Sequence, residues 1–305
     1  MIALVCSLVF SNVCPDMLTI PPIRWSFTEG FGSVIAPSLN ALVDLAIKYD
    51  RTPVFPTIDP PPWSFDELLA MRGEENPIDH PLRVRVYNLK TFAKEFLLQN
   101  ITIGDPVRVD EEHAISTTEG PVIYHGYLDQ MGSRIYNVPR WEWMQTHVVH
   151  TKKTPKISVT VHLRWGDRAF PQRVDVLKRN LGVLFRAAPD LKSRASLDLY
   201  TEMNFPSSLE HKLLSAFPQL AVHRGNEDDL VPHLKAWAAS DIFLMSDSSL
   251  SYFVAQFVHG IVCIEKWDLN QAPSTRAHMN YFEFYDLDPS KLGLAVDNIL
   301  QSKAP

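Results

Sequence analysis

One apolar run of the sequence ends in side chains that could bind an anion. Residues 159–170 read VTVHLRWGDRAF, a β-branched stretch that leads into His162, Arg164 and Asp167. Successive side chains of a strand point to opposite faces, so His162 and Arg164 share a face, while Gly166 permits a turn or the close approach of a ligand. A guanidinium at a strand end can bind two phosphate oxygens at once. The pattern favours an anion site; an Arg164–Asp167 ion pair that closes a loop is the alternative.

A cluster of hydroxyl groups follows a second apolar run. Residues 240–257 read SDIFLMSDSSLSYFVAQF, in which Ser246, Ser248, Ser249 and Ser251 fall within six residues at the expected start of a helix. A helix N-terminus attracts anions because its first N–H groups have no partner within the helix. A helix cap needs only one serine. The surplus of hydroxyls therefore favours a phosphate cradle over a plain cap.

A glycine-rich turn lies near the beginning of the chain. Residues 27–33 read FTEGFGS, and Gly30 and Gly32 indicate that the backbone approaches another group closely between a strand and a helix. The third glycine of a dinucleotide fingerprint is absent, because Ile35 stands there, which argues against a nicotinamide cofactor. Glu29 precedes the glycines and is either a base that faces a cleft or an ordinary exposed carboxylate.

The second half of the chain alternates short apolar runs with helical periodicity. This alternation predicts a parallel sheet with helices on both faces, which binds ligands beyond the carboxyl ends of its strands. Arg164 and Ser246 should lie at that edge. We expect Ser207 and Glu210 to form a capping box and Gly260 to stop a helix. The predicted strands are 157–164, 196–202, 220–225, 241–246 and 261–266, and the predicted helices are 173–188, 208–217, 227–240 and 248–259.

The first half is less regular but begins in the same way. A periodic stretch at 34–49 lies between apolar segments at 23–28 and 51–56, which predicts a β-loop-α-β unit. Further expected elements are strands at 1–10 and 82–88 and helices at 64–71 and 89–99. The whole predicts an α/β chain with an acceptor-side lobe at 1–150 and a nucleotide-sugar-binding lobe at 151–305, joined near 140–156.

Composition and charge narrow the function further. A net charge of −6 argues against nucleic acid as a partner. Cys6, Cys14 and Cys263 lack the spacing of a zinc site or a disulfide framework, and no stretch has the length of a membrane span. The tryptophans of 60–65 and 138–147 either stack on an acceptor sugar or pack in the core.

Three segments together resemble a known family. Residues 27–56, 161–170 and 239–257 are similar to the GDP-fucose-dependent fucosyltransferases of the α1,2, α1,6 and protein-O-fucosyl types, mainly through H-x-R-x-G-D and D-I-x-x-M-S-x-S-S-x-S. The resemblance implies a GT-B fold, with two Rossmann-like, doubly wound domains that face a cleft. It also implies an inverting transfer of fucose from GDP-fucose to a glycan or protein hydroxyl, with no metal and no other cofactor.

The resemblance assigns roles to individual residues as well. Arg164 corresponds to the arginine at the donor diphosphate and His162 to the histidine that borders the nucleotide. Glu29 matches the catalytic base of some protein O-fucosyltransferases, and Asp167 is the second candidate for the base. The other residues expected to bind the donor are Gly30, Gly32, Ser246, Ser248, Ser249, Thr201, Glu202, Asp228 and Asp229.

Three alternatives stay open at this point. Trp165 stands where many family members have a second basic residue, which leaves room for another GDP-sugar as the donor. A non-catalytic GDP-sugar or glycan-binding module on the same scaffold is the non-enzymatic alternative. A metal-dependent GT-A transferase would use Asp286 and Asp288, although capping of a C-terminal helix explains this D-x-D better.

Overall fold

The fold was analysed in a computed structural model of the chain. The structure describes residues 16–24, 31–56, 58–59, 103–130, 137–146, 156–164, 171–201, 206–224, 230–246, 248–264, 281–283 and 288–302. The predicted elements at 1–10, 64–71, 82–88 and 89–99 lie outside these residues.

A small parallel sheet forms the N-terminal lobe. Its strand order is β3-β1-β6-β5, with β1 (Met17–Thr19), β3 (Thr52–Pro53), β5 (Val107–Val109) and β6 (Val122–Tyr124). A separate parallel pair joins β2 (Ile23–Arg24) to β4 (Ile58–Asp59). The lobe also holds the short helix α4 (Ala114–Thr117) and the long helix α1 (Phe31–Lys48).

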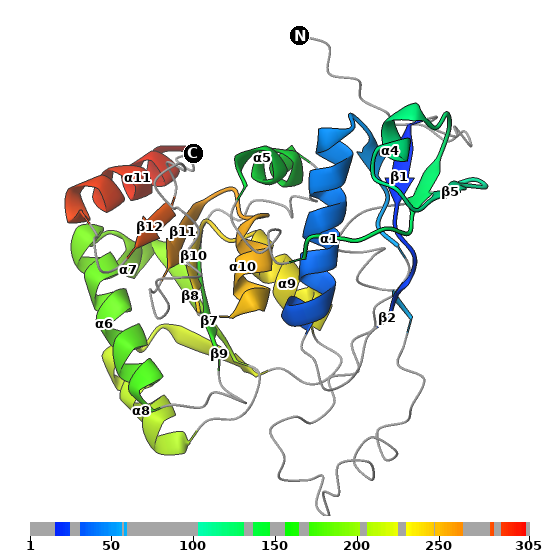
Figure 1. Cartoon of the computed structure of the whole chain (residues 1–305). Helices are drawn as coiled ribbons and strands as arrows, with labels where there is room; N and C mark the ends of the chain where they lie inside the picture. Colours follow the sequence, from blue (N-terminus) through cyan, green and yellow to red (C-terminus); the bar gives the residue numbers. More distant parts are fainter. Residues whose placement is uncertain are drawn as a thin grey trace, which may run out of the picture.

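Helix α1 lies between the two sheets (Figure 1). Every residue from Ile35 to Val43 is buried, so other parts of the protein cover the middle of the helix on all sides. A helix that is apolar all round must be covered on all sides. One flank of α1 faces β1 and β3, and another packs against α10 (Ser249–Ala255) of the second lobe.

A six-stranded parallel sheet forms the C-terminal lobe. Its strand order is β12-β11-β10-β7-β8-β9. The strands are β7 (Ile157–Leu163), β8 (Ala195–Thr201), β9 (Leu220–Arg224), β10 (Ile242–Met245), β11 (Ile261–Ile264) and β12 (Tyr281–Glu283). The predicted α/β class is confirmed, with a parallel sheet in each half of the chain.

Helices cover both faces of this sheet (Figure 1). Ile242 and Leu244 of β10 belong to one buried cluster with α6 (Gln172–Ala187), α8 (Ser207–Ala216) and α11 (Pro289–Ser302), and the short α7 (Leu191–Arg194) lies on the same side. Phe243 and Met245 point the other way, into a cluster with α9 (Leu230–Ala238), α10 and α1. A strand buried on both faces reads as a continuous apolar run, which is the signal that the sequence showed.

The amino ends of the central strands are tied together. Asp241 Oδ2 accepts hydrogen bonds from Ser158 N at 2.7 Å and Ser158 Oγ at 2.9 Å. A Cβ at Gly260 would lie 2.0 Å from Asp241 O, so β11 can approach β10 only with glycine at this position. These contacts fix where β7 and β10 begin and hence where their carboxyl ends finish.

Several local expectations need correction. Ser207 and Glu210 form no capping box, because Pro206 occupies the N-cap position and the Glu210 carboxylate pairs with Arg224. Helix α10 ends at Ala255, so Gly260 does not stop it and serves the strand contact instead. The segment expected to join the lobes contains helix α5 (Val138–Thr146). None of the described helices is long and apolar enough to cross a lipid bilayer.

Candidate functional site

Two motifs from the sequence lie at the same edge of the C-terminal sheet. They are the arginine motif, with His162 and Arg164, and the serine motif, with Ser246, Ser248, Ser249 and Ser251. Arg164 follows the last residue of β7, and Ser246 follows the last residue of β10. The two strands are parallel neighbours, with Val161 opposite Leu244. Their carboxyl ends therefore finish side by side, as the sequence predicted. Arg164 and Ser246 are both half-buried.

His162 links the two motifs through hydrogen bonds. Its side chain is buried, and its Nδ1 lies 2.5 Å from Ser251 Oγ and 3.1 Å from Ser246 Oγ. The two hydroxyls are themselves 3.2 Å apart. A single nitrogen, Nδ1 of His162 in β7, thus contacts both Ser246, which follows β10, and Ser251, which lies near the start of α10.

Ser248 is the N-cap of α10. Its Oγ accepts a hydrogen bond from Leu250 N at 3.3 Å, and its backbone is extended, as a cap requires. Three of the four hydroxyls in the serine motif are therefore engaged within the protein. These contacts within the protein account for most of the surplus of hydroxyls without a ligand. Ser249 is half-buried at the first position of the helix.

Aromatic rings that the sequence analysis did not single out surround His162. The ring of Trp237, from α9, stacks on His162 with centroids 4.4 Å apart and an interplanar angle of 26°. Tyr200, from β8, meets Trp237 edge-on at 6.1 Å and stacks on His223 at 4.5 Å. Burial raises the pKa of Tyr200 to about 12. These rings and the two serines hold the imidazole plane in one orientation.

The remaining predicted donor residues divide into two groups. Thr201 ends β8, is buried and lies opposite Leu163 in the register, so it belongs to the same edge. Gly32 lies in the first turn of α1, which begins earlier than the sequence suggested. The other predicted site residues lie outside the described part of the chain: Glu29, Gly30, Asp167, Glu202, Asp228 and Asp229.

The starts of α1 and α10 lie on the same side of the molecule. The two helices pack against each other, and Figure 1 shows both beginning at the lower end in that view. Asn40, near the middle of α1, accepts a hydrogen bond from Gln256 at the end of α10. The first turn of α1, which contains Gly32, and the first turn of α10, which contains Ser249, are thereby brought to one end of the helix pair.

The sequence left two interpretations of the D-x-D at 286–288, a helix cap or a metal ligand. Asp288 Oδ1 accepts hydrogen bonds from Ser290 N at 2.9 Å and Lys291 N at 3.4 Å, so it caps α11 as expected. Asp286 lies outside the described residues. Among the described residues, no group of three or more His, Cys, Asp or Glu side chains is arranged to hold a metal ion.

One side of the aromatic segment at 138–146 packs against the core of the protein. Residues 138–146 form α5, in which Trp143 packs on the core and meets Phe55 edge-on, with centroids 6.1 Å apart. Trp141 is half-buried in the same helix. For Trp143, core packing is therefore the better of the two explanations that the sequence left open.

Comparisons with known proteins give similarities of fold only. No family model matches the sequence, and no curated protein matches it significantly. The heptosyltransferase WaaC of E. coli, solved with ADP-2-deoxy-2-fluoro heptose, is 13% identical over 94% of this chain and 100% of that chain, with a TM-score of 0.40. POFUT1 in complex with GDP-fucose is 11% identical over 88% of this chain and 97% of that chain, with a TM-score of 0.34.

A further similar structure, described as trehalose-6-phosphate from E. coli bound with UDP-2-fluoro glucose, is 11% identical with a TM-score of 0.32. The match covers 48% of this chain and 36% of that one, so this chain spans only about a third of its length.

Proposed function

We propose that the protein is a glycosyltransferase that uses a nucleotide-sugar donor, and that this donor is GDP-fucose. The observation that carries the proposal is the meeting of the arginine and serine motifs at one carboxyl edge, joined through His162. Parallel α/β sheets bind their ligands at this edge. The donor identity rests on the resemblance of these same motifs to GDP-fucose-dependent fucosyltransferases.

In the proposed reaction, the departing GDP gains negative charge while the sugar gains oxocarbenium character. The Arg164 guanidinium and the N–H groups at the start of α10, beside Ser249, stabilise the diphosphate. A well-placed donor in such a site contributes roughly 3 kcal/mol to the transition state. His162 is buried and hydrogen-bonded to Ser246 and Ser251, so its role is to support the nucleotide site from beneath.

The acceptor hydroxyl must lose a proton as it attacks the anomeric carbon. We assign Glu29 as the general base, with Asp167 as the second candidate, because Glu29 in the segment TEGFGS matches the catalytic base of the protein O-fucosyltransferases that the sequence resembles. General-base assistance contributes roughly 10²- to 10⁴-fold to such a step. Glu29→Gln should therefore lower the transfer rate by about that factor and leave GDP binding unchanged.

A thermal-shift panel of GDP, UDP, ADP, CMP and their sugars tests the donor class. A ligand that binds only the folded state raises the melting temperature by mass action, so GDP and GDP-fucose should give the largest shifts. A flat response across the panel would refute the proposal. GDP-mannose as the strongest ligand would redirect it to another GDP-sugar.

Incubation with GDP-fucose then separates an enzyme from a binding module. We expect slow release of GDP and free fucose by hydrolysis of the donor. With a suitable acceptor we expect faster release of GDP as the fucosyl group passes to the acceptor, and both rates should be the same in EDTA. Tight GDP binding with neither hydrolysis nor transfer would favour the non-catalytic alternative, and loss of activity in EDTA would favour a metal-dependent enzyme.

A further inference from the structure

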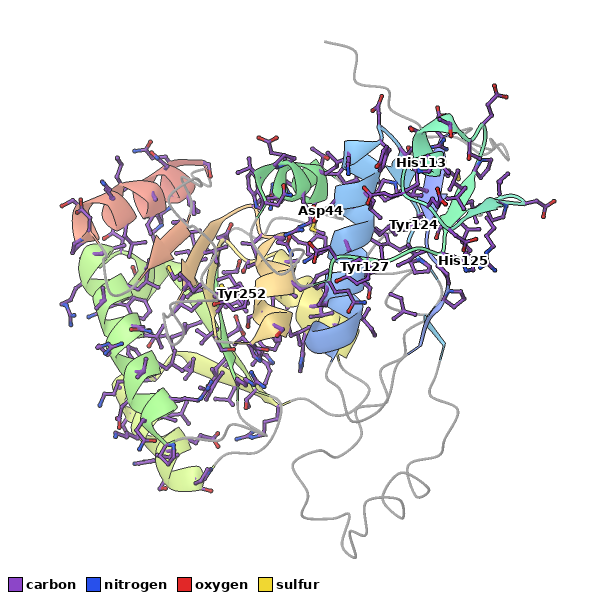
Figure 2. The ribbon with its side chains drawn as sticks, in the orientation of Figure 1. Asp44, His113, Tyr124, His125, Tyr127 and Tyr252 are labelled. Atoms are coloured by element: carbon purple, nitrogen blue, oxygen red, sulfur yellow. The ribbon has the colours of Figure 1, made fainter. Side chains whose placement is uncertain are left out.

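A buried arginine lies where the two lobes meet. Arg140, in the first turn of α5, is 1% exposed. Its guanidinium forms an ion pair with Asp44 of α1 and donates from Nε to Gln256 Oε1 of α10 at 2.9 Å. Figure 2 shows Asp44 on the flank of α1 that faces α5. The Arg140 side chain of α5 thus contacts both α1 of the N-terminal lobe and the end of α10 in the C-terminal lobe.

Amide side chains complete the connection. Gln256 Nε2 donates to Asn40 Oδ1 of α1 at 3.2 Å, and Gln145 Nε2 of α5 donates to the backbone oxygens of Gln256 and Val258 at 2.8 and 2.9 Å. We call the five residues Asn40, Asp44, Arg140, Gln145 and Gln256 the junction network. A buried charge is costly unless it is paired, so the Arg140 guanidinium is stabilised only while α1, α5 and α10 keep these contacts.

The apolar core is also continuous across the junction. Leu39 and Leu42 of α1 belong to the same buried cluster as Phe253 and Phe257, at the end of α10. Separating the lobes would therefore expose apolar surface and the Arg140 guanidinium together.

Helix α10 is consequently held at both ends. Ser251, in its first turns, is bonded to His162 of the sheet, and Gln256, at its other end, is bonded to α1 and α5. The helix has 7 residues, a length of roughly 10 Å at 1.5 Å per residue. A rigid element this short transmits the position of one end directly to the other.

We infer that the junction network, through Arg140, couples the two lobes into one cooperative unit and fixes the start of α10 relative to the start of α1. The first part concerns the fold alone. The second part rests on the proposed function, because it makes Arg140 a positioning residue for the donor site. The two parts have separate readouts.

Unfolding in guanidinium chloride tests the coupling. The wild type should unfold in one transition seen identically by tryptophan fluorescence and far-UV circular dichroism. Arg140→Met leaves Asp44 without its guanidinium, so it should split the guanidinium chloride transition in two. In a separate thermal scan it should lower the melting temperature by roughly 10 °C. A single transition with the wild-type m-value in Arg140→Met, or two transitions in the wild type, would overturn the inference.

Arg51 supplies the matched control. Its half-buried guanidinium donates to Gly120 O at 2.7 Å and to Thr118 O, both within the N-terminal lobe. Arg51→Met should lower stability without splitting the transition. If Arg140→Met does not accumulate as folded protein, Gln256→Ala replaces it. This change keeps the Arg140–Asp44 pair and the Gln145 bonds to the backbone, but it removes the side-chain bonds of Gln256 to Arg140 and Asn40. A wild-type m-value in Gln256→Ala would likewise overturn the inference.

GDP affinity at 20 °C tests the positioning. The dissociation constant should rise roughly 2- to 30-fold in Arg140→Met or its replacement and stay unchanged in Arg51→Met. Equal affinities in the two variants would refute the positioning role. If the wild type itself binds no GDP, the proposed function and the positioning role fail together, while the unfolding experiment still decides whether the lobes are coupled.

Discussion

His162 is held on two sides, by serine hydroxyls at Nδ1 and by the ring of Trp237 against its face. A buried polar side chain is stable only when its partners stay in place, so the imidazole and the two serines depend on one another. This mutual dependence makes His162, Ser246 and Ser251 a structural support for the strand ends that carry the proposed site.

The first prediction at the residue scale concerns Ser251. Ser251→Ala removes one of the two hydroxyls at His162 Nδ1 and should lower the free energy of unfolding by ~1–3 kcal/mol, measured in urea. Ser302→Ala removes a hydroxyl that donates to a backbone carbonyl on the exposed end of α11. That control should cost less than about 0.5 kcal/mol. Equal losses in the two variants would show that the His162 contacts add no stability.

Tyr200 gives a prediction about pH. Its pKa is raised to about 12 in the folded protein, from an ordinary value of 10.0. Between pH 10 and 12 the folded state keeps a proton on Tyr200 that the unfolded chain loses. The stability that Tyr200 contributes through its raised pKa is therefore complete below pH 10 and declines as pH rises toward 12. From pH 8 to 10.5 the wild type should lose ~0.8 kcal/mol more unfolding free energy than Tyr200→Phe. Parallel pH profiles would contradict the assigned burial of the phenol.

The sequence located the motifs of the site but did not show which side chains they contact. Four hydroxyls in six residues predicted a phosphate cradle. In the structure Ser246 and Ser251 form hydrogen bonds with His162, which lies 84 residues before Ser246 in the chain. Only the tertiary fold brings that partner close. Trp237 and Tyr200 escaped notice because single aromatic residues in a helix or a strand are usual core residues.

At the scale of elements, the beginnings of α10 and α11 are capped in the same way by different residues. Ser248 caps α10 within the serine motif, whereas Asp288 caps α11 within the D-x-D. The sequence had offered a ligand role for each of these residues, phosphate binding for Ser248 and metal binding for Asp288. Local backbone geometry explains Asp288 fully and Ser248 in large part.

The Asp288 cap can be tested directly. Asp288→Ala should reduce the free energy of unfolding by ~0.5–2 kcal/mol, because two N–H groups of α11 lose their acceptor. Asp288→Asn keeps an oxygen at that position and should retain most of the stability. Neither change should alter fucose transfer. A variant of wild-type stability that has lost transfer would instead indicate a metal ligand.

Most elements of the C-terminal lobe were predicted closely, although α10 ends four residues before the predicted bound. In the N-terminal lobe the predicted β-loop-α-β unit at 23–56 is present as β2, α1 and β3, whereas the short strands β1, β5 and β6 were not predicted. Strands β7 to β11 and helices α6 and α8 are long or apolar enough for periodicity to show, and their bounds agree within one or two residues. Strands β1, β5 and β6 have 3 residues each, too few to show alternation. Helix α5 was missed because its apolar residues are sparse and its buried positions include Arg140 and Gln145.

At the scale of the whole molecule, the two parallel sheets are joined through packed helices. Helices α1, α5 and α10 meet in a shared core that contains the buried Arg140. The arrangement gathers the starts of α1 and α10 at one end (Figure 1). In our account, the donor binds beside the start of α10, and the acceptor approaches from the side of α1.

Calorimetric titration of GDP into the wild type, Arg164→Ala and Arg224→Ala tests this account most directly. Arg224 ends β9 at the same edge of the sheet and pairs with Glu210, so it matches Arg164 in charge and place without belonging to the motif. The account predicts that Arg164→Ala weakens GDP binding by roughly 10- to 100-fold and that Arg224→Ala leaves it unchanged. Unaltered affinity in Arg164→Ala, or an equal loss in both variants, would contradict it.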